Sequence, residues 1–563
     1  MPECDRAADA QIFQQALGVR KPRLDGIRYI SLSHCWGPPP DPDAPNGGRS
    51  VLNTANVDAW STELPFDWLA ATFQHALLFT AMIGCQLIWI DSLCILQDSK
   101  EDWLAESATM GDIYKYALFN IAALSAKSDS DGFLDKRRDT HVEFGFRAPL
   151  ATLLGRHAGE KRIAADFEGR QLEQECLLLR GSAKLCWAFE KQVTTAASNS
   201  PLFTRGWVYQ ERCLARRTLA FTDQGVFWAC DGGSRSEQPE WATQSMERAG
   251  LRDYQLLARN PGEHGMDAMW QQFHMRWHST VTSYTVCNLT RQTDKLIAVG
   301  AIARELASTE VGAGKYLAGL WETALIEQLD WLCVTGSQTP ARKLVGDAEY
   351  VAPSWSWASI TSPVQPRMPS NPYLEPGPRV VLVEVVAAGV QTLTEYAFGA
   401  VRSGWIRLRG RLNRIDRVVR STHRYSDGTT LPLLSLIDSA TGSSLWFSSD
   451  TLEGHGLKAK GAGTLAWLPL KVRFQRGSIE CSCLVLQEVE GGVRHTGYVQ
   501  HSGERVKLYR RLGKGNFGRV VSRLAEDKLV SGLGTFEVGN GSDAQLAAGF
   551  RARDDGYEEF VLI

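Results

Sequence analysis

An alternation of strand-like and helix-like segments between residues 27 and 125 is the feature that most constrains the fold of this chain. Residues 27–33 form a β-branched and aromatic run that stops at a turn rich in glycine and proline. Residues 68–83 repeat apolar side chains at helical spacing, and residues 86–91 follow as a nearly all-apolar strand. A strand that is apolar on both faces is typical of a parallel sheet covered by helices. The pattern therefore predicts an α/β layered fold.

Further elements of the same kind follow along the chain. Ser99, with Asp102 three residues later, forms a capping-box pattern that predicts a helix through about Tyr116. Residues 120–125 are then expected to form a third short strand. A more polar stretch, about 127–200, is interpreted as a long insertion, after which residues 201–230 indicate a helix followed by two paired strands.

Composition and charge narrow the class of protein. The chain of 563 residues is 44% hydrophobic and 22% charged, which is typical of an ordinary folded protein. Its 61 basic and 63 acidic residues give a net charge of −2, so no global field favours nucleic acid, and we expect no nucleic-acid partner. The chain starts without a secretory pattern, and its most apolar stretch, residues 76–85, is too short to span a bilayer. We therefore expect a cytoplasmic protein without a membrane span.

The twelve cysteines are spread along the chain, mostly inside apolar runs, so we expect reduced and buried thiols. The close pair Cys481-x-Cys483 has no second pair or histidine at zinc-finger spacing, and no metal is expected. A thiol nucleophile at Cys35 or Cys94 is an alternative to a catalytic acid. It is disfavoured because sequence neighbours in a strand, such as His34 and Cys35, point apart.

The second half of the chain has a different texture. Residues 233–365 are expected to form a mostly helical middle region, in which the Trp355-x-Trp357 pair would lie in an extended segment and anchor two packed layers. Residues 366–563 are expected to form an antiparallel β domain, because short alternating runs are separated by turn residues. The segment 513–520 matches the glycine-rich loop of protein kinases, but no His-Arg-Asp or Asp-Phe-Gly segment follows it. We interpret its glycines as hairpin turns.

Several N-terminal blocks, taken in order, closely resemble the fungal heterokaryon incompatibility (HET) domain family. The resemblance covers about residues 25–232, after an N-terminal lead of residues 1–24. Two positions depart from the residues usual in the family, with His34 in place of the commoner Tyr and His75 in place of Asp. The blocks that carry the resemblance are Tyr29–Gly37, Ala71–Ala76, Leu87–Asp98, Asp102–Tyr114 and Arg205–Arg212 with the run to Cys230, and the segments Asp294–Leu296 and Pro353–Ala358 are similar to downstream regions of full-length members.

The resemblance implies both a fold and a role. It implies a TIR-like or flavodoxin-like parallel sheet, because the family is remotely similar to Toll/interleukin receptor (TIR) domains. It also implies a fungal effector of nonself recognition whose activation triggers programmed cell death, a form of fungal innate immunity. Self-association on activation and an incompatibility partner protein are part of the same expectation.

Polar residues follow the first two predicted strands. In open α/β sheets the ligand crevice lies beyond the carboxyl ends of the strands, so these residues are expected to share one rim. Glu106 adds a carboxylate to the otherwise apolar stripe of the following helix, where it needs a partner or a function. The residues expected at this rim are Ser33, His34, Trp36, Gly37 and Asp91.

The similarity to TIR domains suggests a reaction, because several TIR domains cleave NAD with a glutamate on a helix, four residues after a tryptophan. Trp207 and Glu211 have this spacing, which makes Glu211 the candidate catalytic residue. Trp207 and Arg205 are expected to line the pocket with Glu106. NAD would then be the substrate, and no cofactor or metal is required.

Two other interpretations remain open. Arg205, Glu211 and Arg212 could instead form an ion network on a helix surface, with Trp207 as a core anchor. The protein would then be a non-enzymatic module for signalling or oligomerisation. A hydrolase that uses another catalytic group is the third interpretation.

Overall fold

The fold is given by a computed structural model of the full chain. The residues that it describes are 28–38, 50–134, 141–149, 176–184, 200–223, 225–230, 233–236, 266–308, 314–334, 350–366, 379–424, 430–438, 443–449, 465–475, 478–489, 507–520, 529–530, 534–536, 550–552 and 557–563.

The chain divides into two compact units. The first unit comprises Met1–Trp103, Asp112–Phe203 and Glu211–Leu256. The second unit comprises Leu104–Gly111, Thr204–Gln210 and Leu257–Ile563.

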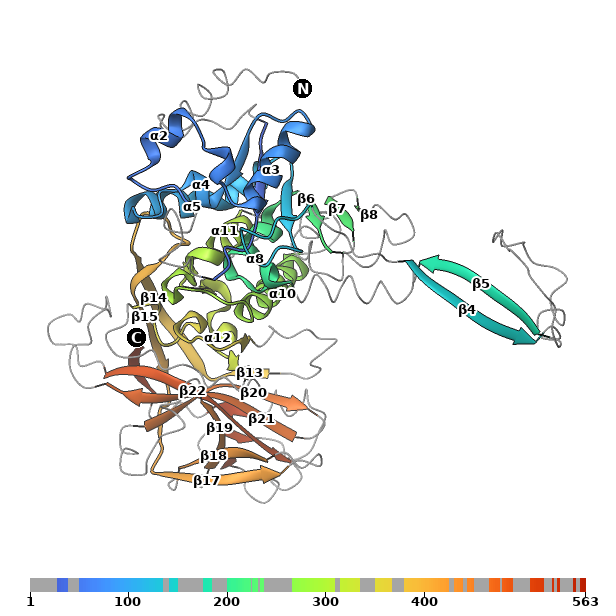
Figure 1. The fold of residues 1–563 in the computed structure, drawn as a ribbon. Helices are drawn as coiled ribbons and strands as arrows, with labels where there is room; N and C mark the ends of the chain where they lie inside the picture. Colours follow the sequence, from blue (N-terminus) through green and yellow to red (C-terminus); the bar gives the residue numbers. More distant parts are fainter. Residues whose placement is uncertain are drawn as a thin grey trace. The chain divides into compact units, whose positions relative to one another are not determined.

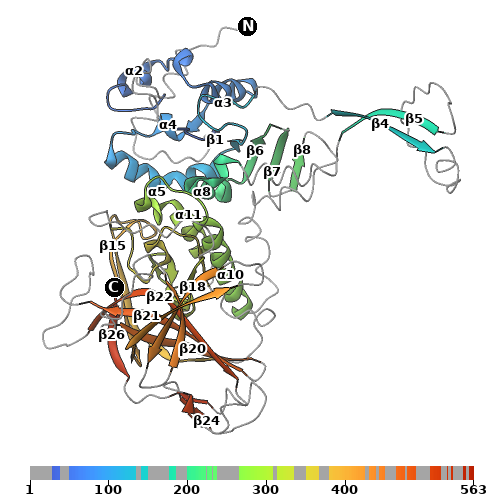
Figure 2. The same cartoon turned by 60° about the horizontal axis from the view of Figure 1, so that its bottom comes forward.

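The core of the first unit is a six-stranded sheet with the order β2-β1-β3-β6-β7-β8. The first four strands in this order run parallel, which confirms the predicted parallel sheet. The last two strands of this order pair antiparallel, β7 with β6 and β8 with β7, and Figure 2 shows β6, β7 and β8 in this succession. The strands are β1 (Ile30–Ser33), β2 (Ile88–Ile90), β3 (Asn120–Ala123), β6 (Arg217–Phe221), β7 (Val226–Cys230) and β8 (Gly233–Ser236).

Helices connect the parallel strands, as βαβ crossovers require. The helices α2 to α5 are drawn in blue in Figure 1, and α8 in green. Ser99 accepts a hydrogen bond from the backbone N–H of Asp102 at 3.2 Å, which confirms the predicted helix cap. The helices are α2 (Val57–Thr62), α3 (Ala71–Met82), α4 (Asp91–Cys94), α5 (Lys100–Tyr116) and α8 (Gly206–Leu214).

Side-chain alternation along β1 separates the two faces of this sheet. Ile30 and Leu32 are fully buried in a cluster with Phe73 of α3. Tyr29 packs instead with Ile113 of α5, so both faces of the sheet are covered. The side chains of Ser31 and Ser33 alternate with those of Ile30 and Leu32, so the two serines point away from α3.

The segment predicted as an insertion contains a β-hairpin. Its strands are β4 (His141–Pro149) and β5 (Cys176–Lys184), which pair antiparallel along their whole length. The cluster of charges at 135–139 that marks this segment in the sequence lies outside the described residues.

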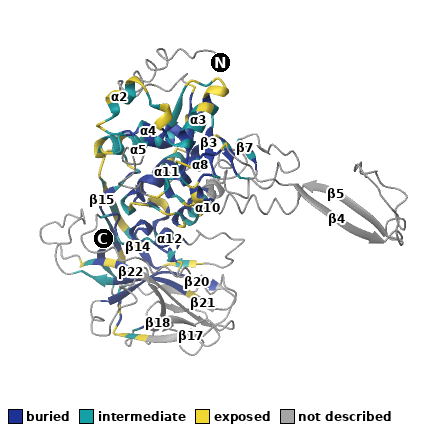
Figure 3. Ribbon diagram, in the orientation of Figure 1, coloured by how far each residue is buried: buried dark blue, intermediate teal, exposed yellow. Residues whose placement is uncertain are grey.

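Helices occur in the second unit within the region 233–365, whereas Gly233–Ser236 at its start form β8 of the first unit's sheet. Figure 3 shows the buried residues of α11 in dark blue. Two short strand pairs, β9 with β10 and β11 with β12, lie between and after the helices. The elements are α10 (Met266–Thr285), α11 (Ile297–Ala307), α12 (Leu325–Gln328), β9 (Tyr316–Leu317), β10 (Leu320–Trp321), β11 (Leu332–Cys333) and β12 (Val364–Gln365).

The tryptophan pair of this region is buried, but its backbone is not extended as predicted. Trp355 and Trp357 are 0% and 1% exposed, and Trp357 begins a 3-10 turn, η8 (Trp357–Ser359). The side chain of Ser356 caps this turn by accepting a hydrogen bond from the backbone N–H of Ala358. This local hydrogen bond favours a turn over the extended backbone that we expected. The indole of Trp357 donates to the carbonyl of Gly319 at 2.8 Å.

The last part of the second unit is a mostly antiparallel sheet of eleven strands, which confirms the predicted β texture. The described exception is β22, which pairs parallel with β26. Its strands are β13 (Arg379–Val381), β14 (Val383–Thr392), β15 (Val401–Gly410), β16 (Asn413–Arg414), β17 (Arg417–Arg424), β18 (Thr430–Asp438), β19 (Ser443–Ser449), β20 (Leu465–Gln475), β21 (Ser478–Glu488), β22 (Lys507–Val520) and β26 (Glu558–Leu562).

The prediction that the glycines of segment 513–520 form hairpin turns is wrong. These glycines lie inside the strand β22, where Gly513 and Gly515 pair with β21 on one side and with β19 on the other. Backbone pairing on both sides outweighs the turn preference of glycine. A separate small sheet contains β23 (Leu529–Val530), β24 (Gly534–Phe536) and β25 (Phe550–Ala552).

Within the described ranges, none of the helices combines the length and the apolar character that crossing a bilayer needs.

Candidate active site at the end of the first strand

Glu211 meets the last residue of β1. The hydroxyl of Ser33 donates to Oε2 of Glu211 at 2.5 Å, across 178 positions of sequence. Glu211 is 4% exposed and Ser33 is 2% exposed, so the bond lies in the interior of the first unit. Helix α8 delivers the carboxylate, and β1 delivers the hydroxyl. The structure thus brings together two residues that the sequence analysis selected separately.

Further buried polar side chains extend this contact along the sheet. Asn120, the first residue of β3, donates from Nδ2 to the oxygen of Ser33 at 2.9 Å. Ser31 donates to Oδ1 of the same Asn120 at 3.1 Å. Ser31 and Asn120 are 0% and 1% exposed, so a continuous row of polar groups runs from the middle of β1 to Glu211.

Tyr114 of α5 lies beside this row. Its hydroxyl donates to the carbonyl of Leu32 at 3.0 Å. Burial raises the pKa of the Tyr114 phenol well above its usual range, and the negative charges of Glu211 and Asp91 raise it further. The phenol of Tyr114 therefore stays protonated and uncharged, and it acts as a hydrogen-bond donor.

A second polar cluster surrounds Asp91. Its carboxylate accepts from the indole of Trp36 at 3.0 Å and from the backbone N–H of Ser92 at 2.7 Å. The hydroxyl of Ser92 lies 3.2 Å from Nε2 of His34, and Nδ1 of His34 lies 3.6 Å from Oδ1 of Asp91. Three of the predicted rim residues, His34, Trp36 and Asp91, are thus brought together.

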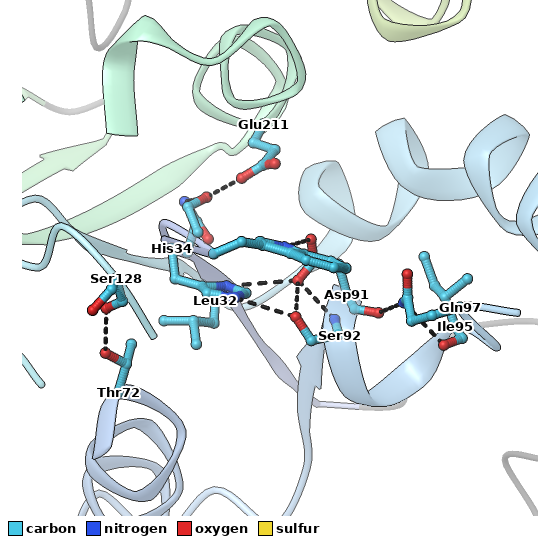
Figure 4. Close-up of polar contacts among 12 residues, drawn as sticks. Leu32, His34, Thr72, Asp91, Ser92, Ile95, Gln97, Ser128 and Glu211 are labelled. Atoms are coloured by element: carbon cyan, nitrogen blue, oxygen red, sulfur yellow. Dashed lines mark hydrogen bonds and ion pairs between the residues drawn. The ribbon is translucent and has the colours of Figure 1, made fainter. Parts of the chain in front are cut away.

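The two clusters lie on opposite faces of one strand end. Because Ser33 and His34 are sequence neighbours in extended backbone, their side chains point apart. The ring of His34 meets Phe73 of α3 edge-on at 4.9 Å, whereas Ser33 meets α8. Figure 4 shows Glu211 on one side of His34, and Asp91 and Ser92 on the other.

The contacts of Ser92, His34 and Asp91 follow the order of a hydrolase triad, but the geometry does not support a nucleophilic serine. The separation of 3.6 Å between His34 and Asp91 is longer than a hydrogen bond. The Ser92 hydroxyl also donates directly to Asp91 at 3.2 Å and is buried, with Ser92 1% exposed. This cluster holds the loop after β1 in place.

Gly37 ends this loop in a conformation that favours glycine. Its φ is +76°, and a Cβ added there would lie 2.6 Å from Cβ of Ser128. Gly37 therefore allows the loop that carries Trp36 to pack closely against Ser128.

The remaining predicted pocket residues have contacts within the second unit. The indole of Trp207 donates to Asp294 at 3.3 Å, and Arg205 forms a parallel β-bridge with Asn288. Glu106 is half-buried on α5, where its carbonyl accepts from the Thr109 hydroxyl. A role of Glu106, Arg205 and Trp207 in lining a pocket stays a prediction.

Sequence reasoning missed Ser31, Asn120 and Tyr114 as parts of this site. A signal for the first was present, because the pattern Ile-Ser-Leu-Ser of residues 30–33 places both serines on one face of a strand that is otherwise apolar. Asn120 was a polar residue at the start of an apolar strand. Nothing in the sequence indicated that Tyr114 would lie near Glu211.

Of the two cysteines considered as nucleophiles, Cys35 is buried and Cys94 is half-buried. Among the residues placed by the structure, no group of three or more His, Cys, Asp or Glu side chains is arranged to hold a metal ion.

The fold and the site define an α/β domain with buried polar clusters at the carboxyl end of its first strand. Residues 29–211 match the family described as Heterokaryon incompatibility protein (HET), and the chain therefore carries a HET domain. The match begins at Tyr29 and ends at Glu211, so it encloses both polar clusters. It supports a role in heterokaryon incompatibility in general. Comparisons with curated proteins and with solved structures returned no match.

Proposed function

We propose that this protein is a fungal nonself-recognition effector that triggers cell death by cleaving NAD into nicotinamide and ADP-ribose. Glu211 is the essential carboxylate in this proposal. The observation that carries it is the position of Glu211, which is buried at the end of the first strand and hydrogen-bonded to Ser33. A carboxylate in that position is removed from bulk water. In such an environment of low dielectric constant, its charge acts more strongly on a nearby cation than it would in water.

The strand order supports a site at this place. The parallel strands follow the order β2-β1-β3-β6, which begins like the doubly wound order of flavodoxin-like folds. Such folds bind ligands at the carboxyl ends of the strands, at the switch point between the first and third strands. Ser33 ends β1, and Asn120 belongs to the neighbouring β3. The order is also the basis for proposing a TIR-like domain.

The proposed reaction needs only a well-placed negative charge. The bond between C1′ of the ribose and the nicotinamide nitrogen breaks, and nicotinamide leaves as a neutral ring with the electron pair. The ribosyl group becomes an oxocarbenium-like cation, which the carboxylate of Glu211 stabilises. Water then adds to C1′ and loses a proton, giving ADP-ribose.

Aromatic and polar residues would hold the substrate. Trp36, in the same unit as Glu211, offers a flat face for the nicotinamide or adenine ring. Ser33, His34, Gly37 and Asp91 complete the proposed set of binding residues in this unit.

Access to Glu211 must be regulated in this proposal. A side chain that is 4% exposed meets a dinucleotide only after its surroundings move. Self-association on activation, in response to an incompatibility partner, would supply that change. The rate of NAD cleavage per molecule is then expected to rise with protein concentration.

The test is release of nicotinamide by the purified full chain, measured by chromatography at rising protein concentration and with a crowding agent. The variant Glu211→Gln keeps the shape of the side chain and removes its charge. The matched control is Glu63→Gln, which changes an exposed glutamate after α2. We expect wild type and Glu63→Gln to release nicotinamide and Glu211→Gln to lose at least about 100-fold in rate. Equal rates for the two variants contradict the role of Glu211 and favour a hydrolase with another catalytic group.

Burial of Glu211 also favours a second candidate function. A carboxylate that is 4% exposed and hydrogen-bonded to Ser33 can serve packing alone, and the domain would then be a non-enzymatic module that signals through partners or oligomers. Expression of a folded Glu211→Gln variant in fungal cells separates the two candidates. Persistent cell death supports the module, and loss of cell death supports the enzyme.

A further inference from the structure

The hydrogen bonds behind Glu211 all run in one direction. Ser31 donates to Asn120, Asn120 donates to Ser33, and Ser33 donates to Glu211. The three donor-acceptor distances are 3.1, 2.9 and 2.5 Å. Each residue of this donor chain, which we define as Ser31, Asn120 and Ser33, is at most 2% exposed.

The chemistry of the groups fixes that direction. An ionised carboxylate only accepts, so the Ser33 hydroxyl donates its one hydrogen to Glu211 and can only accept from Asn120. A carboxamide donates only from its nitrogen, so Nδ2 of Asn120 faces Ser33 and Oδ1 faces the Ser31 hydroxyl. The oxygen of Ser33 then accepts from Asn120, and the hydroxyl hydrogen of Ser33 is directed to Glu211. An ionised carboxylate is an acceptor only, and it completes the chain without conflict.

The last bond joins a hydroxyl donor to a carboxylate acceptor. Hydrogen bonds to an ionised carboxylate are roughly twice as strong as bonds between neutral groups. Linked hydrogen bonds polarise one another in a medium of low dielectric constant, so the upstream members strengthen the bond to Glu211. Tyr114 is a neutral phenol near the same carboxylate and adds no competing charge.

We propose that Ser33 and Asn120 are positioning residues, which hold the carboxylate of Glu211 ionised and aimed, and that Ser31 extends the donor chain behind Asn120. The inference rests on the proposed NAD cleavage for its effect on rate. Its physical core, the coupling of the donor chain to Glu211, is independent of that activity.

The sharpest variant is Asn120→Asp, because it keeps the shape of the side chain and removes the donor. While it is ionised, an aspartate cannot donate to Ser33, so the Ser33 hydroxyl would turn toward the new carboxylate and leave Glu211. We expect kcat for nicotinamide release to fall about 10- to 100-fold with KM within about twofold of wild type, as for residues that orient a reacting group. Ser33→Ala should lower kcat by a similar factor, and its KM is left out of this test because Ser33 also belongs to the proposed binding residues.

The control is Thr80→Val, an isosteric change at a buried hydroxyl of α3 that donates to the carbonyl of Ala76 at 2.7 Å. Its kcat and KM should equal those of wild type. If Asn120→Asp and Thr80→Val retain the same kcat while wild type is active, the positioning role is wrong.

A second measurement tests whether Ser33 and Glu211 are energetically coupled, and it does not depend on enzyme activity. Urea unfolding of wild type, Ser33→Ala, Glu211→Gln and the double variant forms a double-mutant cycle. We expect the shift of the unfolding midpoint caused by Ser33→Ala to shrink by at least half in the Glu211→Gln background. Additive shifts overturn the inference. A wild type that releases no nicotinamide contradicts only the proposed function, and the cycle then decides the donor chain by itself.

Discussion

At the scale of single residues, His75 on α3 holds the start of a neighbouring loop. Its Nδ1 accepts from the backbone N–H groups of Phe133 at 3.0 Å and Leu134 at 3.2 Å. Its ring also meets Phe133 edge-on at 5.7 Å. An aspartate, the residue usual in the HET family at this position, is also an acceptor for backbone N–H groups. The departure from the family pattern therefore conserves the hydrogen-bonding role.

This role predicts how two substitutions differ. His75→Leu leaves both N–H groups without their acceptor and should lower the free energy of unfolding by about 1–3 kcal/mol. His75→Asp should lose less than half of that amount, because a carboxylate accepts both bonds. Urea unfolding at pH 7 measures the two values. Equal losses for both variants contradict the acceptor role.

A buried amine makes stability depend on pH. Lys295 is 4% exposed, donates to the carbonyl of Ile360 and lies 5.8 Å from the ring centre of Trp357. Burial lowers the pKa of the Lys295 amine to about 7, against 10.5 for its ordinary value. Between these pKa values the unfolded chain binds a proton that the folded chain does not, so stability from this residue rises with pH.

The variant Lys295→Met removes this titration. The free energy of unfolding of wild type relative to the variant should rise from pH 7 to pH 9, with a slope approaching about 1.4 kcal/mol per pH unit. Below pH 6 the difference should become constant. Urea unfolding of both proteins across this range is the measurement, and a difference that stays flat from pH 7 to pH 9 contradicts the lowered pKa.

At the scale of elements, the loop after β1 depends on Gly37. Gly84, after α3, has a similar φ of +74° but nothing within 4 Å of an added Cβ, whereas Cβ at Gly37 would lie 2.6 Å from Ser128. Gly84→Ala should therefore cost only the backbone strain, about 1–2 kcal/mol. Gly37→Ala should cost more, because the clash adds to the same strain. Thermal and urea unfolding compare the two, and an equal loss of stability would show that Ser128 moves aside freely.

Short-range patterns predicted most elements of the first unit. The apolar spacing of residues 68–83 and the cap at Ser99 are local signals, and α3 and α5 form where these signals lie. Local signals failed where tertiary pairing was stronger. The glycines of 513–520 lie in β22 because two neighbouring strands pair with it, and no pattern within that segment reports those partners.

The site was predictable only in part, for the same reason. The rule that ligands bind at strand ends selected Ser33, His34 and Asp91 from local sequence. The contact of Glu211 with Ser33 joins residues 178 positions apart, and no local pattern predicts it. The TIR resemblance, through the spacing of Trp207 and Glu211, selected Glu211 alone. The donor chain needs the register of β1 against β3, in which Ser31 lies opposite Asn120, and sequence alone does not give a register.

At the scale of the whole molecule, we assign a chemical activity, the cleavage of NAD, to the residues that match the HET family. The HET match covers residues 29–211, and the buried carboxylate that ends it is the group to which the activity is assigned. Activation by self-association predicts that the activity belongs to an assembled state of the full chain.

The most direct measurement is nicotinamide released from NAD by the full chain, at low and high protein concentration, for wild type and Glu211→Gln. The account predicts release that rises more steeply than in proportion to the concentration of wild type, and none above background from Glu211→Gln. Release from a folded Glu211→Gln variant at the wild-type rate would contradict it.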